Sequence, residues 1–241
     1  MYKKILFLLS CLTISLLSAA EEHTLLVGTN AEFPPFSYIE DKTLVGFDID
    51  VANEVAQRLG KAIQFKDMPF DALIPDLILG RVDFVAAGMS YTPERAKRVF
   101  FTKSYLSEDP FTILSSSKQA LSLDDLKGKT VIVIEGFTAD QLISSKAGIN
   151  VIRLPSQADG FMALKSGRAD AFITAKSTVD AFFELHDDSQ FHMTVLEDTS
   201  ETCALMVPKN KAKLLIDIQT ALDEMENDGT MAKLKAKWKL Q

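Results

Sequence analysis

Apolar residues along the chain follow two alternating spacings from residue 24 to the C-terminus. Short apolar runs have the length and composition of buried strands. They are TLLVGT (24–29), AIQFKDM (62–68), DFVAAG (83–88), FTILSS (111–116), TVIVIEG (130–136), NVIRL (150–154), ADAFIT (169–174) and CALMVPK (203–209). Between these runs, apolar residues recur every three or four positions, as Phe47, Val51, Val55 and Leu59 do, which predicts helices. The alternation of strands with helices predicts an α/β fold.

The strands and helices fall into two sets, separated by the polar segment SSSKQALSLDDLKGK. Segments 77–88 and 164–175 share a pattern in which a helix is followed by Gly-Arg, one residue, Asp and a strand. Either the chain forms two similar lobes, or this pattern is only the ordinary helix–glycine–strand joint of α/β proteins. CALMVPK resembles a strand that returns to the first set, and no low-complexity linker separates the sets. Two lobes would therefore be connected by crossing strands.

The first twenty residues have the pattern of a secretory signal peptide. Two lysines precede an apolar run at 5–17, and small residues lie before Glu21. We predict cleavage after residue 20 and a periplasmic location. A membrane anchor is one alternative, against which the short apolar run argues, and a lipid anchor at Cys11 is another.

Charge and composition exclude several classes of function. The sequence has 26 basic and 33 acidic residues, and loss of Lys3 and Lys4 with the signal peptide leaves a net charge of −9. Such a chain is unsuited to binding nucleic-acid phosphates and is compatible with a cationic ligand. Cys203 would be the only cysteine left, so no internal disulfide is expected, and the three histidines lack metal-ligand spacing. We expect no metal, no cofactor and no nucleic-acid partner.

A cation in the first turn of a predicted helix is the strongest pointer to a binding site. In AAGMSYTPERA, Thr92 suits the N-cap and Pro93 the first helical position, whereas Arg95 lies at the positive end of the helix dipole. A guanidinium can bind a carboxylate through two parallel hydrogen bonds, and Ser90 adds a hydroxyl and an N–H at the same turn. Arg95 either forms a structural salt bridge with an acidic side chain or binds a ligand carboxylate. We favour the ligand.

Two other turns are candidates for the same site. After the strand TVIVIEG, Gly136 permits a tight turn and Thr138 is expected to cap the next helix, whose free N–H groups would hold the carboxylate from the other side. The loop TNAEFPPFSY is expected to be irregular because of its two prolines, and it carries Glu32 and Phe33. Phe33 and Phe70 would offer aromatic faces to a cation. For either ring a place in the core is the alternative.

Enzyme motifs are absent from the sequence, which has no G-x-S-x-G, no H-E-x-x-H and no glycine-rich phosphate loop. The paired carboxylates Asp48/Asp50 and Asp124/Asp125 have the positions of helix-start or solvated residues. We predict a binding protein that is not an enzyme.

Five motifs resemble one protein family in order along the whole mature chain. They are VGTNAEFPPFSY, LVGFDIDVANEVAQRLG, FDALIPDLILGRVDFVAAGMSYTPERAKRVFFTKSY, LKGKTVIVIEG and DGTMAKLKAKW. They resemble the polar amino acid-binding proteins of bacterial ABC transporters (solute-binding protein family 3), and among these the arginine-binding members such as the chlamydial one. The resemblance implies a two-lobed periplasmic binding protein fold of type II, with two crossing strands as a hinge. Such a protein closes on one free amino acid, for delivery to a membrane permease.

The resemblance also implies limits for the two lobes. Lobe 1 would comprise residues 24–110 and 204–241, and lobe 2 would comprise residues 111–203. Each lobe would be a mostly parallel sheet with flanking helices, and we expect the protein to be a monomer.

Roles for individual residues follow from the same resemblance. Arg95 and Ser90 resemble the pair that holds the ligand α-carboxylate, and the N–H of Thr138 would complete this clamp from lobe 2. The carbonyl of Gly88 would receive the α-ammonium. The adjacent residues Ala87, Met89 and Ala139 belong to the same predicted site.

The ligand side chain would lie between Phe33 and Phe70. Asn30 stands where lysine-, arginine- and ornithine-binding relatives carry an Asp that pairs with the distal cation. We predict that Glu32, Glu135 or both pair with a guanidinium instead, and that the ligand is L-arginine.

A second departure from the family concerns the α-ammonium. Relatives place an Asp two residues past the second-lobe strand, where this chain has Ala175 followed by Lys176. The ammonium would rely on carbonyls or on another acid. Two alternative functions remain at this point: a dehydratase that acts on prephenate or arogenate, and a surface interaction protein that has kept the fold without the ligand.

Overall fold

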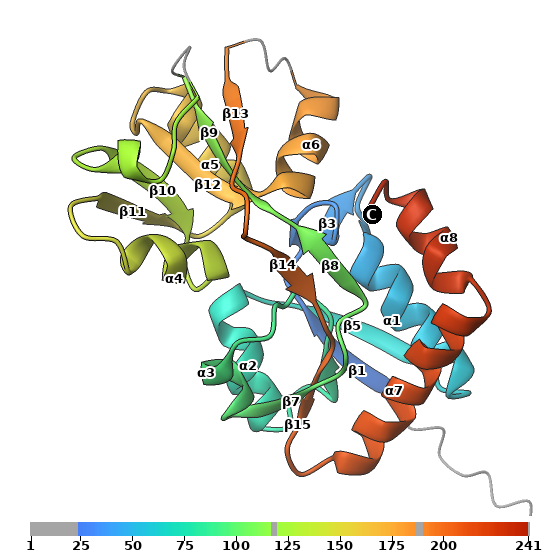
Figure 1. Cartoon of the computed structure of the whole chain (residues 1–241). Coiled ribbons are helices and arrows are strands. Elements are labelled where there is room, and N and C mark those ends of the chain that lie inside the picture. Colours follow the sequence, from blue (N-terminus) through green and yellow to red (C-terminus); the bar gives the residue numbers. More distant parts are fainter. Residues whose placement is uncertain (1–23, 117–119, 187–189, 241) are drawn as a thin grey trace, which may run out of the picture.

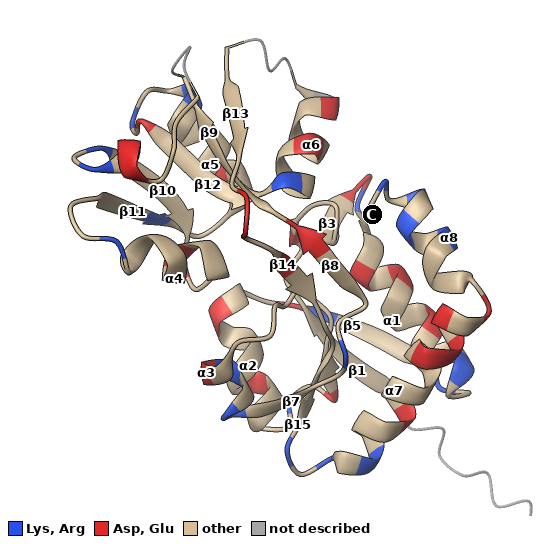
Figure 2. Ribbon diagram, in the orientation of Figure 1, with Lys and Arg blue, Asp and Glu red and all other residues tan. Residues whose placement is uncertain are grey.

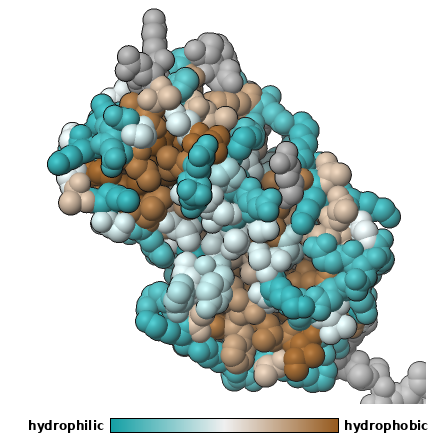
Figure 3. Space-filling view, in the orientation of Figure 1, coloured by the Kyte–Doolittle hydropathy of each residue, from teal (hydrophilic) through white to brown (hydrophobic). Residues whose placement is uncertain are grey.

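The computed structural model describes residues 24–116, 120–186 and 190–240, which form two lobes joined by a pair of extended strands (Figure 1). The predicted signal peptide and Cys11 lie outside these residues. Within them, no helix combines the length and the apolar character that crossing a membrane requires. In the space-filling view, hydrophobic patches lie on both lobes, and the waist between them is mostly neutral to polar (Figure 3).

Lobe 1 is built on a five-stranded sheet in the order β5-β1-β6-β15-β7. Strands β5, β1 and β6 are parallel, and β15 is antiparallel to both of its neighbours. These strands are β1 (Leu25–Thr29), β5 (Ile63–Asp67), β6 (Phe84–Val85), β7 (Val99–Phe101) and β15 (Met206–Pro208). The helices are α1 (Phe47–Arg58), α2 (Phe70–Ile78), α3 (Pro93–Ala96), α7 (Ala212–Asn227) and α8 (Thr230–Lys237). In α1, Phe47, Val51 and Val55 are fully buried, as their four-residue spacing predicts.

Lobe 2 has a sheet of the same size in the order β11-β10-β12-β9-β13. Strands β11, β10 and β12 are parallel, and β9 is antiparallel to its neighbours. These strands are β9 (Phe111–Ser115), β10 (Thr130–Ile134), β11 (Asn150–Leu154), β12 (Ala171–Ala175) and β13 (His192–Val195). The helices are α4 (Thr138–Ser144), α5 (Gln157–Lys165) and α6 (Lys176–Leu185), with a short 3₁₀ helix at Asp124–Leu126.

The two sheets share one topology. In each, three parallel strands are followed by one antiparallel strand and then by an edge strand. The two similar segments at 77–88 and 164–175 lead into β6 and β12, which are the third strands of the two sheets. This equivalence supports the interpretation of the shared pattern as two similar lobes.

Two strands cross between the lobes, as predicted. They are β8 (Leu106–Asp109) and β14 (Glu201–Cys203), which pair antiparallel with Glu201 opposite Asp109 (Figure 1). Strand β8 leads into β9 of lobe 2, and β14 leads into β15 of lobe 1. The lobe limits at residues 110 and 203 stay a prediction.

The segment that follows β1 differs from expectation. It forms a small antiparallel sheet of β2 (Glu32–Phe33), β3 (Ser37–Glu40) and β4 (Thr43–Val45), with two prolines in the turn between β2 and β3. The sequence indicated an irregular loop because strands of two to four residues are too short to show an alternating pattern.

Gly160→Ala in α5 is expected to lower the free energy of unfolding by about 1–3 kcal/mol, because a methyl group there would overpack the core. An added Cβ would lie 2.6 Å from the ring of Phe172, which is fully buried in β12. Helix propensity alone predicts the opposite sign, a gain of about 1 kcal/mol. Urea unfolding measures the change, with Met162→Ala, at a position of α5 that is 63% exposed, as the control. A stabilised Gly160→Ala variant would contradict this packing.

Candidate ligand-binding site

Arg95 is buried where the two lobes meet. It lies in α3, where the hydroxyl of the N-cap residue Thr92 accepts a hydrogen bond from the Arg95 N–H at 3.2 Å. One terminal nitrogen of the guanidinium donates to the Ser90 carbonyl at 2.7 Å. The other donates at 2.9 Å to the carbonyl of Gly136, in the turn between β10 and α4 of lobe 2. The side chain predicted to hold an anion therefore contacts both lobes, and only 8% of it is exposed.

The acid beside Arg95 is Glu201, at the start of the hinge strand β14. Its two carboxylate oxygens accept hydrogen bonds from the hydroxyls of Ser90 in lobe 1 and Thr138 in lobe 2. Burial raises the pKa of Glu201, while the two hydroxyls and the charge of Arg95 lower it. Burial lowers the pKa of Arg95, and Glu201 raises it. The cation and the acid thus compensate each other electrostatically inside a buried site.

The expected capping role of Thr138 is wrong. The N-cap position of α4 belongs to Phe137, no side chain caps that helix, and the Thr138 hydroxyl binds Glu201 instead. Capping preferences reflect hydrogen bonds between a side chain and nearby backbone N–H groups of the same helix. The Thr138 hydroxyl instead donates to an acid on the hinge strand.

Three aromatic rings meet beside this cluster of polar groups. Phe137 of lobe 2 contacts both Phe33, at 5.0 Å between ring centroids, and Phe70, at 4.3 Å. The Arg95 guanidinium lies 5.5 Å from the centre of the Phe70 ring, within the range of a cation–π contact. The structure therefore brings the two predicted aromatics to one place, with Phe137 as a third ring that the sequence analysis missed.

The loop that carries Gly88 is held from below by Asp48. The Gly88 N–H donates to one carboxylate oxygen of Asp48, and the Tyr105 hydroxyl donates to the other at 2.9 Å. Gly88 has a φ of +57°, and a Cβ there would lie 2.4 Å from the Phe33 ring, so no other residue fits. Asp48 does lie in the first turn of α1, but it is fully buried and supports the site, so the alternative of a solvated carboxylate is wrong for it.

The other predicted site residues have varied surroundings. Asn30 is buried, and its side-chain amide donates to the Met68 carbonyl at 3.2 Å. Glu32 and Glu135 are exposed. Ala87 and Met89 are buried in a hydrophobic cluster of lobe 1, and Ala139 is buried in one of lobe 2. Their roles toward a ligand stay predictions.

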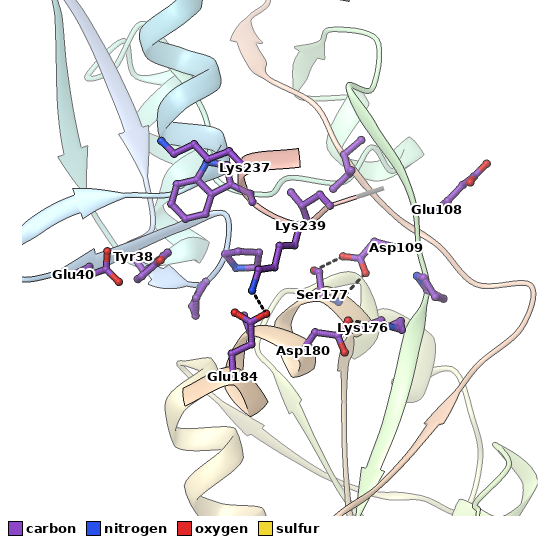
Figure 4. Close-up of a pocket in the computed structure, with 17 residues that line it drawn as sticks. Tyr38, Glu40, Glu108, Asp109, Lys176, Ser177, Asp180, Glu184, Lys237 and Lys239 are labelled. Carbon is purple, nitrogen blue, oxygen red and sulfur yellow. Dashed lines mark hydrogen bonds and ion pairs between the residues drawn. The ribbon is translucent and has the colours of Figure 1, made fainter. Parts of the chain in front are cut away.

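A separate cavity of about 530 Å³ lies between α6, α8 and the hinge strand β8 (Figure 4). None of the twelve predicted site residues lines it. At its edge, Lys239 after α8 donates to Glu184 of α6 at 2.6 Å, which links the lobes through an exposed ion pair of small energetic value. At the predicted site, Phe137 contacts Phe33 and Phe70, and the Glu201 carboxylate binds the hydroxyls of Ser90 and Thr138.

The polar side chains at and just after the end of β12 have partners within lobe 2. The Thr174 hydroxyl donates to the side-chain oxygen of Gln157 at 3.1 Å, and the Lys176 ammonium is paired with Asp180. Among the described residues, no three His, Cys, Asp or Glu side chains are grouped so that they could hold a metal ion.

A family model for the bacterial extracellular solute-binding proteins, family 3, matches residues 25–241. The chain belongs to this family. It is 32% identical over 249 residues to the arginine-binding extracellular protein ArtP of Bacillus subtilis, with 98% of both chains covered. It is 28% identical over 241 residues to the probable ABC transporter arginine-binding protein ArtJ of Chlamydia trachomatis, with 95% of this chain and 92% of that protein covered.

The fold also has a close match among solved structures. An ancestral arginine-binding protein bound to arginine matches with a TM-score of 0.85 at 38% identity, covering 89% of this chain and 97% of that one. These similarities confirm the predicted family and the two-lobed fold.

Asp48→Asn is expected to change the pH dependence of stability. Burial raises the pKa of Asp48 to about 6, so the folded state binds more protons than the unfolded state between about pH 4 and about pH 6. The free energy of unfolding therefore falls as pH rises through this window. This contribution, on the order of 2 kcal/mol, should disappear in the variant.

Urea unfolding of wild type and Asp48→Asn at about pH 4.5 and about pH 7.5 measures the difference. Asp71→Asn, at an exposed position of α2, is the matched control for the exchange itself. The same pH dependence in wild type and Asp48→Asn would show that Asp48 is not the group responsible.

Proposed function

We propose that this protein binds a free basic amino acid, L-arginine, between its lobes and presents it to the membrane permease of an ABC transporter. The observation that carries the proposal is the buried guanidinium of Arg95, which is held by a carbonyl from each lobe beside two hydroxyls. Similarity to three arginine-binding proteins supports the choice of arginine. Export to the periplasm by residues 1–20 and a monomeric state are part of the same proposal.

Arg95 has capacity left for a ligand carboxylate. A guanidinium has five N–H donors, and the two carbonyls accept from only two of its nitrogens. The remaining donors, with the hydroxyls of Ser90 and Thr138, would bind the α-carboxylate. Because these groups belong to both lobes, the ligand would bind the closed protein more tightly than the open one and so shift the population toward closure.

The ligand side chain would lie among Phe33, Phe70 and Phe137. A guanidinium stacks on aromatic faces, with a gain of about 0.5–2 kcal/mol that grows with desolvation. A side chain that enters between Phe33 and Phe70 would replace their present contacts with Phe137. Glu32 and Glu135, on the β2 strand and the β10–α4 turn, are the proposed partners of the distal charge.

L-Arginine is expected to raise the melting temperature of the mature protein by about 5–10 °C at 100 times its dissociation constant, because a ligand that binds only the folded state stabilises it by about 2.7 kcal/mol. Differential scanning fluorimetry across the twenty amino acids measures this shift. Glutamine and glutamate, which lack the distal cation, should produce smaller shifts. If no amino acid changes the melting temperature, the proposed function is wrong.

Arg95→Ala is expected to weaken arginine binding by about 30-fold or more, because truncation of one partner of a buried charge pair costs several kcal/mol. Isothermal titration calorimetry measures the affinity, and circular dichroism checks the fold. Arg98→Ala, at an exposed position just after α3, is the matched control and should bind like wild type. A folded Arg95→Ala variant with wild-type affinity, or one that fails to fold, would favour a purely structural role for Arg95.

A further inference from the structure

Glu201 places a carboxylate between the lobes. The ligand contacts proposed above do not include it. The residue is 8% exposed, and its two carboxylate oxygens accept hydrogen bonds from one hydroxyl of each lobe. Acidic residues lie on β8 and on the segment just before β14, where the lobes are connected (Figure 2).

A bound amino acid brings a cation as well as an anion into the closed site. Its α-ammonium has three donors and no acceptor, and burying it without a counter-charge costs several kcal/mol. Arg95 compensates the α-carboxylate. In the described part of the chain, β12 ends at Ala175, whose buried methyl group offers no counter-charge to the ammonium.

The neighbouring acids are already occupied by lobe 2. Both oxygens of Asp109 accept hydrogen bonds from Ser177, from its N–H at 3.0 Å and from its hydroxyl at 2.6 Å. Asp180 is paired with the Lys176 ammonium. Glu201 is the acid whose partners are the hydroxyls of the predicted ligand clamp.

Glu201 can accept an ammonium beside its hydroxyl partners or in place of them, because a hydroxyl that donates its one proton to the ligand carboxylate no longer donates it to Glu201. An ionised carboxylate offers about four lone-pair positions, and the two hydroxyls use two of them. The Ser90 hydroxyl also lies 2.8 Å from the Thr202 carbonyl, so its single proton can turn there and leave a further lone pair of Glu201 free. An adjacent ammonium would favour the ionised form of the carboxyl.

We propose that Glu201 receives the α-ammonium of the bound amino acid and so supplies the acid that Ala175 lacks. The closed site then contains two compensated pairs, Arg95 with the α-carboxylate and Glu201 with the α-ammonium. This inference rests on the proposed function, because it requires that the ligand is an amino acid. It does not depend on which side chain that amino acid carries.

The test compares L-arginine with 5-guanidinopentanoate, which is arginine without the α-amino group. Isothermal titration calorimetry gives the affinity of wild type, Glu201→Gln and Glu197→Gln for both ligands. In wild type, loss of the amino group should weaken binding about 100-fold or more, because it leaves the buried carboxylate unpaired. In Glu201→Gln, arginine should bind about 100-fold more weakly, the analogue should change less than about threefold, and the penalty for losing the amino group should largely disappear.

Glu197→Gln removes an exposed acid shortly before β14 and should behave as wild type. Glu201→Asp keeps the charge on a shorter side chain, so it should bind both ligands more weakly and still prefer arginine. If Glu201→Gln does not fold, Glu201→Asp decides alone, because loss of the preference for arginine in this variant contradicts the proposal.

Two results would overturn the role of Glu201. Equal weakening of both ligands in Glu201→Gln would mean that the side chain only supports the hinge. Tighter binding of arginine would mean that the carboxylate competes with the ligand's own for the clamp. If wild type binds a different amino acid, the choice of arginine is wrong. The role of Glu201 is then tested by the same comparison with that amino acid and its des-amino analogue. If wild type binds no amino acid, both proposals fail.

Discussion

A guanidinium buried between two lobes is the interaction on which the rest of this structure depends. A buried charge without partners costs several kcal/mol, so Arg95 needs hydrogen-bond acceptors and a counter-charge. One comes from its own turn, at Ser90, one from lobe 2, at Gly136, and a compensating acid comes from the hinge, at Glu201. Because these groups lie on three separate parts of the fold, Arg95 has all three of these partners only when the lobes are close together.

At the proposed site, side chains of the two lobes contact one another. Phe137 contacts both Phe33 and Phe70, and the Glu201 carboxylate binds the hydroxyls on the two sides of the cleft. A ligand that entered this proposed site would exchange contacts in addition to making new ones. Its effect on closure therefore depends on the difference between its contacts and those of the side chains that it replaces.

Asp48 orders the Gly88 loop of the proposed site from the side of the lobe 1 core. Asp48 holds the Gly88 N–H and the Tyr105 hydroxyl, and the conformation of Gly88 in turn lets the Phe33 ring lie against the loop. A buried carboxylate with two donors orders a loop at the cost of its own desolvation, which appears as its raised pKa. The geometry of the Gly88 loop is thus coupled to the protonation of Asp48.

The sequence by itself determined the elements whose signals are local. The periodicity of α1, the apolar runs of the two sheets, and the capped turn that carries Arg95 all depend on residues within a few positions of one another. Tertiary structure decided which distant groups meet. The hydroxyl of Thr138 was expected to cap its own helix but binds Glu201, and no local pattern distinguishes that glutamate from a solvated one. The physical reason is that burial and charge compensation arise only when separate segments pack together, whereas capping and periodicity act along the chain.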